Sequence, residues 1–154
     1  METVYRDTVA AYVVSADGKI LFGRKDPAKG GVYADCWHIP GGGIDTGETP
    51  EQAVKREILE ETNLDTSEAQ IQLVDDRGKG ESIKHVPGKD DVLVKMTFRI
   101  YRVVLPKTAA ESSVSPLDDL IDLTWFDYAE LDQIKMVPPA YKLFERIGTE
   151  WLQI

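Results

Sequence analysis

Apolar residues near the start of the chain gather in short segments with the pattern of β-strands. Residues 8–15 (TVAAYVVS) are mostly apolar and β-prone, and the apolar pattern resumes at residues 20–22 after the turn sequence ADGK. Two such segments around a short turn predict a β-hairpin across residues 16–18. Residues 37–39 (WHI) form another short segment, which stops at Pro40 and the following glycines. The chain is therefore expected to begin with β-structure.

Three more strands are expected further along, at residues 70–74, 92–105 and 121–126. Between the first two of them, residues 75–90 are polar and contain glycines and a proline, which predicts a long loop. A loop of that length, 75–91 at its widest, suits either a mobile lid over a substrate or a plain surface excursion.

The central helix is well marked at both ends. Thr49 is a natural N-cap, Pro50 suits the first helical position, and Gln52 completes a capping box. The helix is expected to end at Thr62, with Asn63 in the left-handed conformation. Further helices are expected at residues 128–134 and 138–152, the latter with Tyr141, Leu143, Phe144, Ile147 and Trp151 as its apolar stripe. The pattern predicts an α+β fold, a mixed α/β/α sandwich in which helices flank a mixed β-sheet.

The central helix carries an unusual group of glutamates. Glu57, Glu60 and Glu61 fall within an arc of about 100° on one face, close to the negative end of the helix dipole. Glu57 and Glu61 are also a like-charge pair one turn apart, which destabilises a helix by a few tenths of a kcal/mol. A divalent cation such as Mg²⁺ or Mn²⁺ would relieve both conflicts. A solvated acidic face is the alternative, and the spacing by itself does not exclude it.

Composition and charge narrow the class of protein. The length of 154 residues suits one domain over residues 1–154, and the net charge of −9 disfavours broad binding to nucleic acid or to anionic membranes. Cys36 is the single cysteine, so no disulfide forms within the chain, which fits a cytoplasmic protein. No apolar run approaches the length of a membrane span.

The glutamates belong to a longer spaced pattern. Gly42 is followed after five residues by Glu48, and after seven more by residues 56–61 (REILEE) and then Leu64. This arrangement resembles the Nudix box, G-x5-E-x7-R-E-U-x-E-E-x-G-U with U aliphatic. Every fixed position agrees except the last glycine, where this chain has Asn63, the next-best residue for a left-handed helix end. The chain resembles MutT-like members of the Nudix hydrolase superfamily, and the strands around the box fit their fold.

The resemblance implies roles for the box residues. Glu57, Glu60 and Glu61 look like the metal-binding set, and either Glu57 or Glu60 is the candidate base that takes a proton from the attacking water. Arg56 resembles the arginine that orients these carboxylates, paired with Glu48 or Glu60. The remaining implied positions are Gly41, which offers a backbone carbonyl to the metal, and Gly42 and Gly43, which allow a sharp substrate-binding loop.

Two candidates lie outside the box. Asp119 precedes Trp125 by six residues, which resembles the spacing of an additional metal-binding acid in the family; Asp118 and Asp122 are its alternatives. Arg24 could reach substrate phosphates, since guanidinium groups suit phosphate oxygens, but an exposed loop cation is equally consistent with its position.

The resemblance implies an enzyme of the acid-anhydride hydrolase class with Mg²⁺ or Mn²⁺ as cofactor. Water would cleave the P–O–P linkage of a nucleoside diphosphate joined to another group. The default expectation is a MutT-like nucleoside triphosphate pyrophosphohydrolase that releases a monophosphate and pyrophosphate. Hydrolysis of a nucleotide sugar, as by GDP-mannose hydrolases, and a non-catalytic nucleotide-sensing module are the alternatives. The expected partner is a small nucleotide and not a nucleic acid or a membrane, and a homodimer is possible.

Overall fold

The computed structural model describes residues 1–29, 33 and 35–148. The strands and helices, in chain order, are β1 (Glu2–Val14), β2 (Ile20–Lys25), the 3-10 turn η1 (Pro27–Lys29), β3 (Trp37–His38), β4 (Gly41–Gly43), α1 (Pro50–Thr62), β5 (Gln70–Lys84), β6 (Val92–Val104), β7 (Leu120–Phe126), the 3-10 turn η2 (Tyr128–Glu130) and α2 (Pro138–Ile147). The expected α+β fold is confirmed.

β1 is the central strand of a mixed sheet whose described strands run in the order β3-β2-β1-β6-β5. It lies parallel to β6 from Glu2↔Val92 to Val14↔Val104. β4 pairs with the middle of β1, at residues 8–10, and β7 pairs with β2. The expected hairpin between β1 and β2 is present, although only the pair Val14↔Ile20 joins its two strands.

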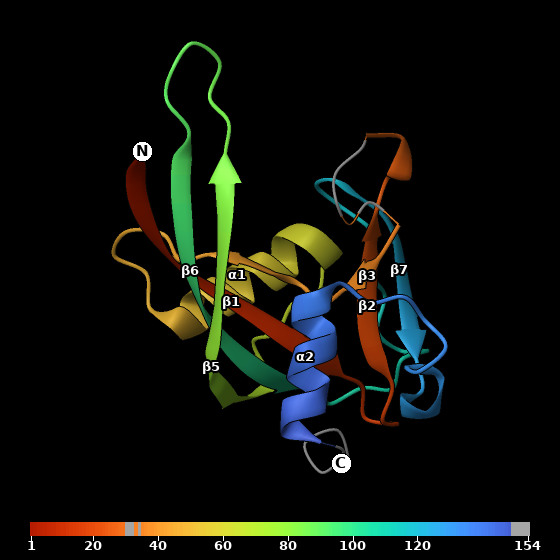
Figure 1. Ribbon diagram of the computed structural model, residues 1–154. Helices are drawn as coiled ribbons and strands as arrows, with labels where there is room; N and C mark the ends of the chain where they lie inside the picture. The colour runs from red at the N-terminus through yellow and green to blue at the C-terminus, as the bar shows by residue number, and fades with distance from the viewer. Residues whose placement is uncertain (30–32, 34, 149–154) are drawn as a thin grey trace.

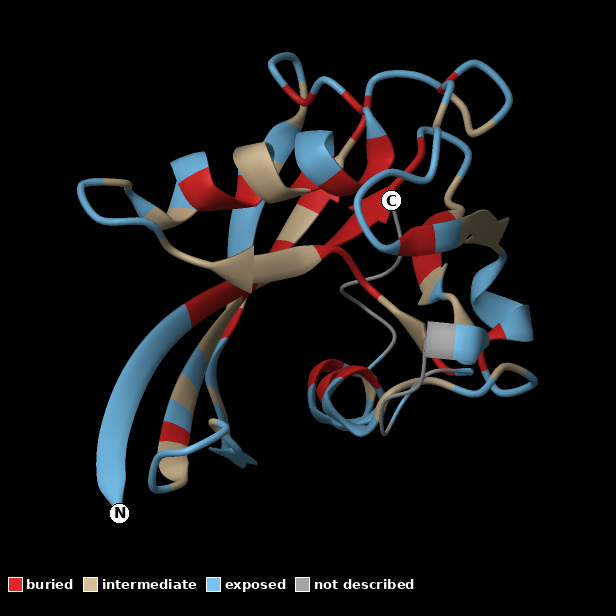
Figure 2. Ribbon diagram, turned by 90° about the horizontal axis from the view of Figure 1, so that it is seen from above, coloured by how far each residue is buried: buried red, intermediate tan, exposed pale blue. Residues whose placement is uncertain are grey.

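The two helices cover opposite faces of the sheet (Figures 1 and 2). α1 packs Ala53, Val54 and Ile58 against the side chains of β1 that point to one face, among them Val9 and Val13. α2 closes the other core cluster, which contains Tyr12, Val14, Phe22, Ile100, Leu143 and Ile147. Alternate residues of β1 therefore serve two cores, because successive side chains of a strand point to opposite faces.

The largest difference from the sequence-based expectation is in β5. This strand continues to Lys84 through the segment expected to be a loop, and it pairs with β6 from Gln70 to Lys84, with register shifts between Leu73 and Asp75 and between Asp75 and Gly78. Gly78 and Gly80 lie opposite Phe98 and Met96, where the missing glycine side chains leave room for their larger partners. The expectation of a long loop was wrong because the backbone bonds to β6 and this cross-strand packing offset the low strand propensity of glycine.

Smaller differences occur at three other elements. β1 begins at Glu2, six residues before the expected start. The helix expected at residues 128–134 is only the turn η2, and Leu131 after it is buried. Tyr141 is 59% exposed and therefore does not belong to the apolar stripe of α2. The expected last turn of that helix, including Trp151, lies outside the described residues.

The ends of α1 follow the sequence closely. The Gln52 amide N–H donates to Thr49 Oγ1 at 3.2 Å, and the Thr49 amide N–H donates to Gln52 Oε1 at 3.0 Å, which completes the capping box. At the other end, Asn63 has φ 63° and its N–H donates to the Leu59 carbonyl. Local chemistry therefore fixes where the glutamate helix begins and ends.

The left-handed Asn63 gives a direct stability prediction. An Asn63→Gly variant is expected to raise the free energy of unfolding by up to about 1 kcal/mol, because glycine lacks the Cβ that disfavours this conformation. Urea denaturation of both proteins measures the difference. Asn63→Ala is the matched control and should destabilise the fold; equal stability of the alanine and glycine variants would contradict the argument.

Candidate active site

Arg56 is the hub of the charged groups on α1. Its Nε and Nη2 donate to the two carboxylate oxygens of Glu48 at 2.7 and 2.9 Å, and Nη2 also donates to the Gly43 carbonyl at 2.9 Å. Nη1 donates to Glu57 at 2.9 Å and to Glu60 at 3.2 Å. The sequence left Glu48 and Glu60 open as partners of Arg56, and the structure shows that it contacts both.

These contacts keep Arg56 and Glu48 in their charged forms. The hydrogen bonds from Arg56 lower the pKa of Glu48 to about 2. The carboxylates around Arg56, with Glu48 as the largest contributor, raise the pKa of its guanidinium above its ordinary value. Glu48 and Arg56 are therefore ionised at every physiological pH, and together they tie the glycine segment β4 to α1.

Glu57 and Glu61 lie together beneath the glycines of β4. Glu61 is buried, and its pKa is raised first by burial and second by the neighbouring Glu57. The Gly41 amide N–H donates to Glu61 Oε1 at 3.4 Å, and a Cβ on Gly42 would collide with the Glu57 carboxylate. Gly42 is thus required here because the main chain passes directly over the Glu57 carboxylate, whereas a Cβ on Gly41 would collide with the backbone of β1 at Val9.

Asp119 follows a segment that packs on the end of α1. The Leu117 N–H donates to the Glu61 carbonyl at 3.0 Å and the Ser115 N–H to the Thr62 carbonyl at 3.0 Å, so this segment satisfies the last carbonyls of α1. The charge of Asp119 contributes to the raised pKa of Glu61, and its own carboxylate forms an ion pair with Lys25 at 3.3 Å. The direct contact of this acid is therefore with Lys25, and its role as a metal ligand stays a prediction.

The donor set at this place fits a hard divalent cation. Glu57 and Glu61 are two carboxylates held together largely out of water, and burying like charges is unfavourable unless a cation compensates them. Glu60 differs, since its side chain is 53% exposed and is turned onto Arg56. In the part of the chain that the structure describes, no three acidic, histidine or cysteine side chains already form a metal-ligand group. The fit to a divalent cation therefore depends on Glu57 and Glu61. Glu60 is more exposed, and Asp119 is paired with Lys25.

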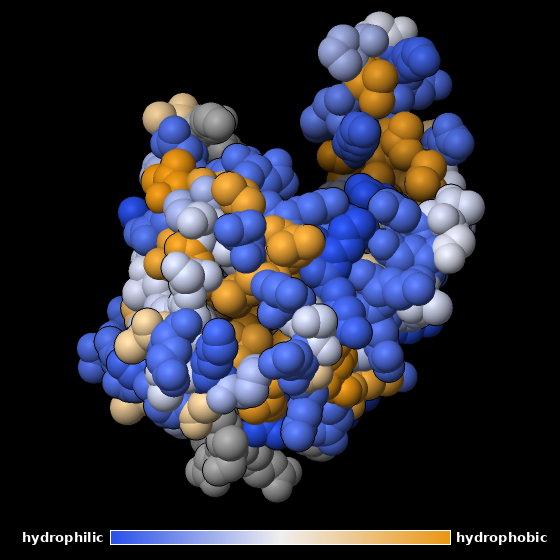
Figure 3. Space-filling model, turned by 180° about the vertical axis from the view of Figure 1, so that it is seen from behind, coloured by the Kyte–Doolittle hydropathy of each residue, from blue (hydrophilic) through white to orange (hydrophobic). Residues whose placement is uncertain are grey.

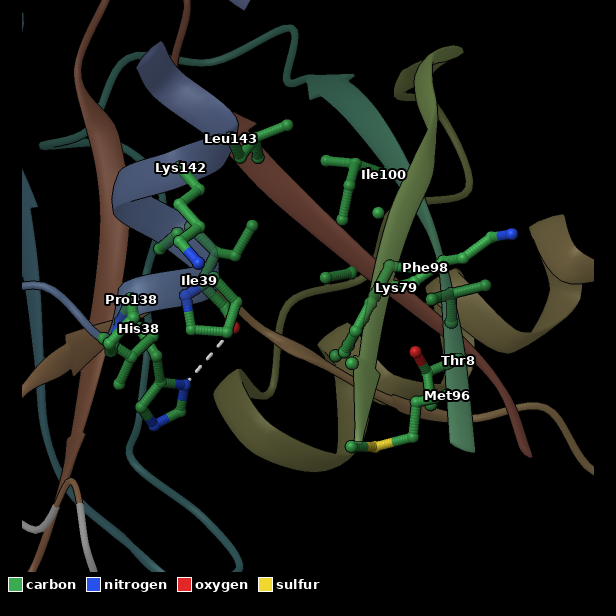
Figure 4. Close-up of a pocket in the computed structure, with 18 of the residues that line it drawn as sticks. Thr8, His38, Ile39, Lys79, Met96, Phe98, Ile100, Pro138, Lys142 and Leu143 are labelled. Carbon is green, nitrogen blue, oxygen red and sulfur yellow. Dashed lines mark hydrogen bonds between the residues drawn. The ribbon is translucent and has the colours of Figure 1, made fainter. Parts of the chain in front are cut away.

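A cavity of about 760 Å³ opens beside the glycines, on the α2 side of the sheet (Figure 4). Its wall is mainly apolar and includes Val9, Ala10, Ile39, Met96, Phe98, Ile100, Pro138 and Leu143. Gly41 and Gly42 line one part of it, so the cavity borders the segment that covers the glutamates. An apolar space of this size next to a carboxylate group suits the ring system of a ligand whose charged part lies at the carboxylates.

Cationic side chains stand at the α2 and β5 side of the same cavity. Lys142 and Arg146 of α2 and Arg77 of β5 line it. Arg77 and Arg146 both bind Asp75, a fully buried carboxylate, at 2.9 and 2.7 Å. The sequence analysis gave these residues no role, although the one-turn spacing of Lys142 and Arg146 on a helix was visible.

His38 is another lining residue to which the sequence analysis gave no role. Its Nδ1 lies 3.2 Å from the Ile39 carbonyl (Figure 4), and burial lowers the pKa of its imidazole. Its Nε2 is buried and has no hydrogen-bond partner among the described residues. A neutral imidazole with a bond at Nδ1 leaves Nε2 as an acceptor.

Arg24 lies away from the cavity lining. It extends over the ring of Trp37, 5.4 Å from the ring centroid, and forms an ion pair with Asp122 at 3.6 Å. Trp37 itself packs edge-on against Phe126, so it is part of the core. The structure therefore gives Arg24 partners of its own and does not bring it to the glutamates.

Among the described residues, neither α1 nor α2 has the length and apolar character that a membrane-crossing helix needs.

Comparison with known proteins places the chain in a family. Over a segment of 67 residues the chain is 37% identical to an RNA pyrophosphohydrolase of Hydrogenovibrio crunogenus; this segment covers 44% of the chain and only 37% of that relative. The fold resembles that of the Escherichia coli dihydroneopterin triphosphate pyrophosphohydrolase, with a TM-score of 0.65 and 17% identity over 93% of this chain and 96% of the other. It also resembles a MutT NUDIX hydrolase from Burkholderia pseudomallei, with a TM-score of 0.62 and 25% identity over 94% and 99% of the two chains. The sequence model of the NUDIX domain matches residues 4–147. The chain therefore belongs to the NUDIX domain family.

Proposed function

We propose that this protein is a divalent-metal-dependent pyrophosphohydrolase that cleaves the P–O–P linkage of a nucleoside diphosphate joined to another group. The observation that carries the proposal is the Glu57–Glu61 pair, held under the glycines of β4 at the border of a largely apolar cavity. The cavity would take the nucleoside, and the carboxylates would lie at the phosphates. As in the family, the cofactor would be Mg²⁺ or Mn²⁺, with Glu57, Glu60 and Glu61 as its main ligands and the Gly41 carbonyl and Asp119 as further ones.

The reaction forms one P–O bond from water and breaks the P–O bond of the anhydride, so that a phosphate or pyrophosphate group leaves. A bound divalent cation would neutralise the charge that develops on the phosphate oxygens. Arg56 holds Glu57 and Glu60 in place through its Nη1 atom, and Glu48 holds Arg56. One oxygen of Glu57 or Glu60 accepts the proton of the attacking water.

The most general substrate consistent with these observations is a nucleoside triphosphate, cleaved to a monophosphate and pyrophosphate. A second candidate is the 5′-triphosphate end of an RNA, because the matching relative is named an RNA pyrophosphohydrolase and because Lys142 and Arg146 line the cavity. The net charge of −9 favours the smaller substrate. Nucleotide-sugar hydrolysis and nucleotide sensing without turnover are the remaining alternatives.

A substrate screen with and without Mg²⁺ tests the proposal. The full chain is incubated with nucleoside triphosphates, 5′-triphosphorylated oligonucleotides, nucleotide sugars, ADP-ribose and dinucleoside polyphosphates, and the products are separated by chromatography. Metal-dependent release of a monophosphate from one class supports the proposal and identifies the substrate. Tight binding of a nucleotide without any cleavage would instead support the sensing module.

Glu60 provides a first test of the residue roles. A Glu60→Gln variant is expected to keep the fold and to lower kcat by at least about a hundredfold. The substitution removes one negative charge from the carboxylates that are proposed to bind the metal and to accept the proton of water. Steady-state kinetics with the substrate found in the screen measures the effect. Glu51→Gln is the matched control, because Glu51 lies exposed in the first turn of the same helix. A kcat near that of the control would remove Glu60 from the catalytic set.

A further inference from the structure

The first residues of β1 form a free edge of the sheet. Glu2 to Arg6 pair with β6 on one side only, because β4 covers the other side of β1 only at residues 8–10. All side chains from Glu2 to Asp7 are exposed. With β5 and β6 they build an arm that projects beyond the body of the molecule (Figure 1). A free strand edge of this kind pairs readily with another strand unless something blocks it.

The hydrogen bonds of β1 show which backbone groups point out of this edge. The Ile44 N–H donates to the Asp7 carbonyl at 3.0 Å, and the Ala11 N–H donates to the Pro40 carbonyl at 2.9 Å. Odd-numbered residues of β1 therefore turn their backbone groups away from β6. By the alternation of a strand, the N–H and C=O of Thr3 and Tyr5 point outward from the free edge.

We propose that this edge binds a second copy of the chain, by antiparallel pairing of the two β1 strands about Val4. In this register Thr3 of one copy lies opposite Tyr5 of the other, and the outward groups of these two residues form four hydrogen bonds across the twofold axis. The pairing places Glu2 of each copy opposite Arg6 of the other. The segment is thus complementary to itself in both hydrogen bonding and charge.

Two observations favour this register over its neighbours. Glu2 and Arg6 form no ion pair or hydrogen bond with any other residue that the structure describes, so both charges are unpaired, although the Arg6 guanidinium lies beside Gly43 of β4. Pairing about Tyr5 would instead place Glu2 opposite Thr8, where β4 already occupies the edge, and would leave Arg6 opposite Val4. Compared with pairing about Tyr5, the register centred on Val4 keeps the contact within residues 2–6 and places opposite charges opposite each other.

The arm also carries apolar surface that pairing would partly cover. Figure 3 shows apolar residues on the projecting arm, and Val4, at the centre of the proposed pairing, is 37% exposed. The contact is confined to a short strand edge, so it buries much less surface than a permanent dimer does. The proposal is therefore a reversible dimer with one continuous sheet across the two arms, and it does not depend on the proposed catalytic function.

Sedimentation velocity over a wide range of protein concentration tests the proposal, with charge-swap variants of the full chain. Wild type should show a concentration-dependent dimer. Arg6→Glu and Glu2→Arg should each weaken association by at least about tenfold, because each places like charges opposite one another twice across the axis. The double variant, Glu2→Arg with Arg6→Glu, should restore it. Lys89→Glu at the tip of the arm is the matched control and should associate like the wild type.

Three results would overturn the proposal. They are a monomer at all concentrations, a dimer unaffected by either single reversal, and a double variant that associates no better than the single ones. Tyr5→Pro is an independent test, because it removes an outward N–H that β6 does not use. It should weaken the dimer and leave the circular dichroism spectrum unchanged. A folded Tyr5→Pro variant that dimerises like the wild type would also exclude this edge.

Discussion

A Glu61→Gln variant is expected to lose roughly a thousandfold in hydrolytic rate and yet to unfold at a higher temperature than the wild type in metal-free, alkaline solution. Both effects have one cause, the carboxyl group buried beside Glu57. Burial and that neighbouring charge raise the pKa of Glu61 from 4.5 to about 8. Glutamine keeps the shape of the side chain, cannot ionise, and is a much poorer ligand for a divalent cation.

The direction of the pH effect follows from proton linkage. Between pH 4.5 and about pH 8, the folded protein keeps the proton of Glu61, whereas the unfolded chain releases it. Stability from this group is therefore complete below pH 4.5 and decreases as the pH rises to about 8. The advantage of the Glu61→Gln variant should grow over the same range and then stay constant.

Thermal unfolding in the presence of a chelator, across this pH range, measures the effect. Glu51→Gln on the same helix is the control and should show no such trend. Added Mg²⁺ should stabilise the wild type and reduce the difference, since the cation binds the folded wild type in preference to the variant. A variant that is less stable than the wild type above pH 8 in chelator would contradict this account of Glu61.

Arg56→Lys is the second substitution with a large expected effect, on both stability and activity. Arg56 binds Glu48 through two nitrogens and also donates to the Gly43 carbonyl, Glu57 and Glu60. A lysine ammonium is a single compact charge and cannot serve these acceptors in the same plane. We expect a melting temperature lower by several degrees and a kcat lower by at least about a hundredfold, because Glu57 and Glu60 lose their fixed orientation.

Lys55→Arg is the reciprocal control, made at the exposed residue that precedes Arg56 in the same helix. Urea denaturation and steady-state kinetics are compared for the two variants.

The Glu48–Arg56 ion pair also makes the stability of the wild type depend on pH. Because Arg56 lowers the pKa of Glu48 from 4.5 to about 2, the stability contributed by this pair in the wild type is complete above pH 4.5 and decreases as the pH falls from 4.5 to about 2. Equal behaviour of both variants would show that a single positive charge at position 56 is sufficient.

The box helix could be predicted from sequence because its determinants are local. Thr49, Gln52 and Asn63 fix the ends of α1 by bonds to residues three or four positions away. The resemblance to the Nudix box, and the match of the NUDIX domain to residues 4–147, agree with this reading. The suggested roles of Glu60 and Glu61 are tested by the variants above, and those of Glu57 and Asp119 stay predictions.

The cavity could not be predicted in the same way. It is formed by β1, the β5–β6 pair and α2, which are far apart from one another in the sequence, and β5 itself was expected to end at Val74. The glycines of that strand have low strand propensity, and only their pairing with Phe98 and Met96 of β6 explains them. Arg77 and Arg146 likewise acquire a common partner, Asp75, only when β5 and α2 come together.

The limits of the glutamate helix and the order of charges along it follow from the sequence, because they depend on side-chain period and on contacts within a few residues. The different environments of those charges depend on the tertiary structure. It buried Glu61 beside Glu57, turned Glu60 outward onto Arg56 and paired Asp119 with Lys25. It also left the edge of β1 free. Burial, electrostatic environment and unpaired edges depend on which distant segments pack together, and the spacing of residues along one chain does not contain that information.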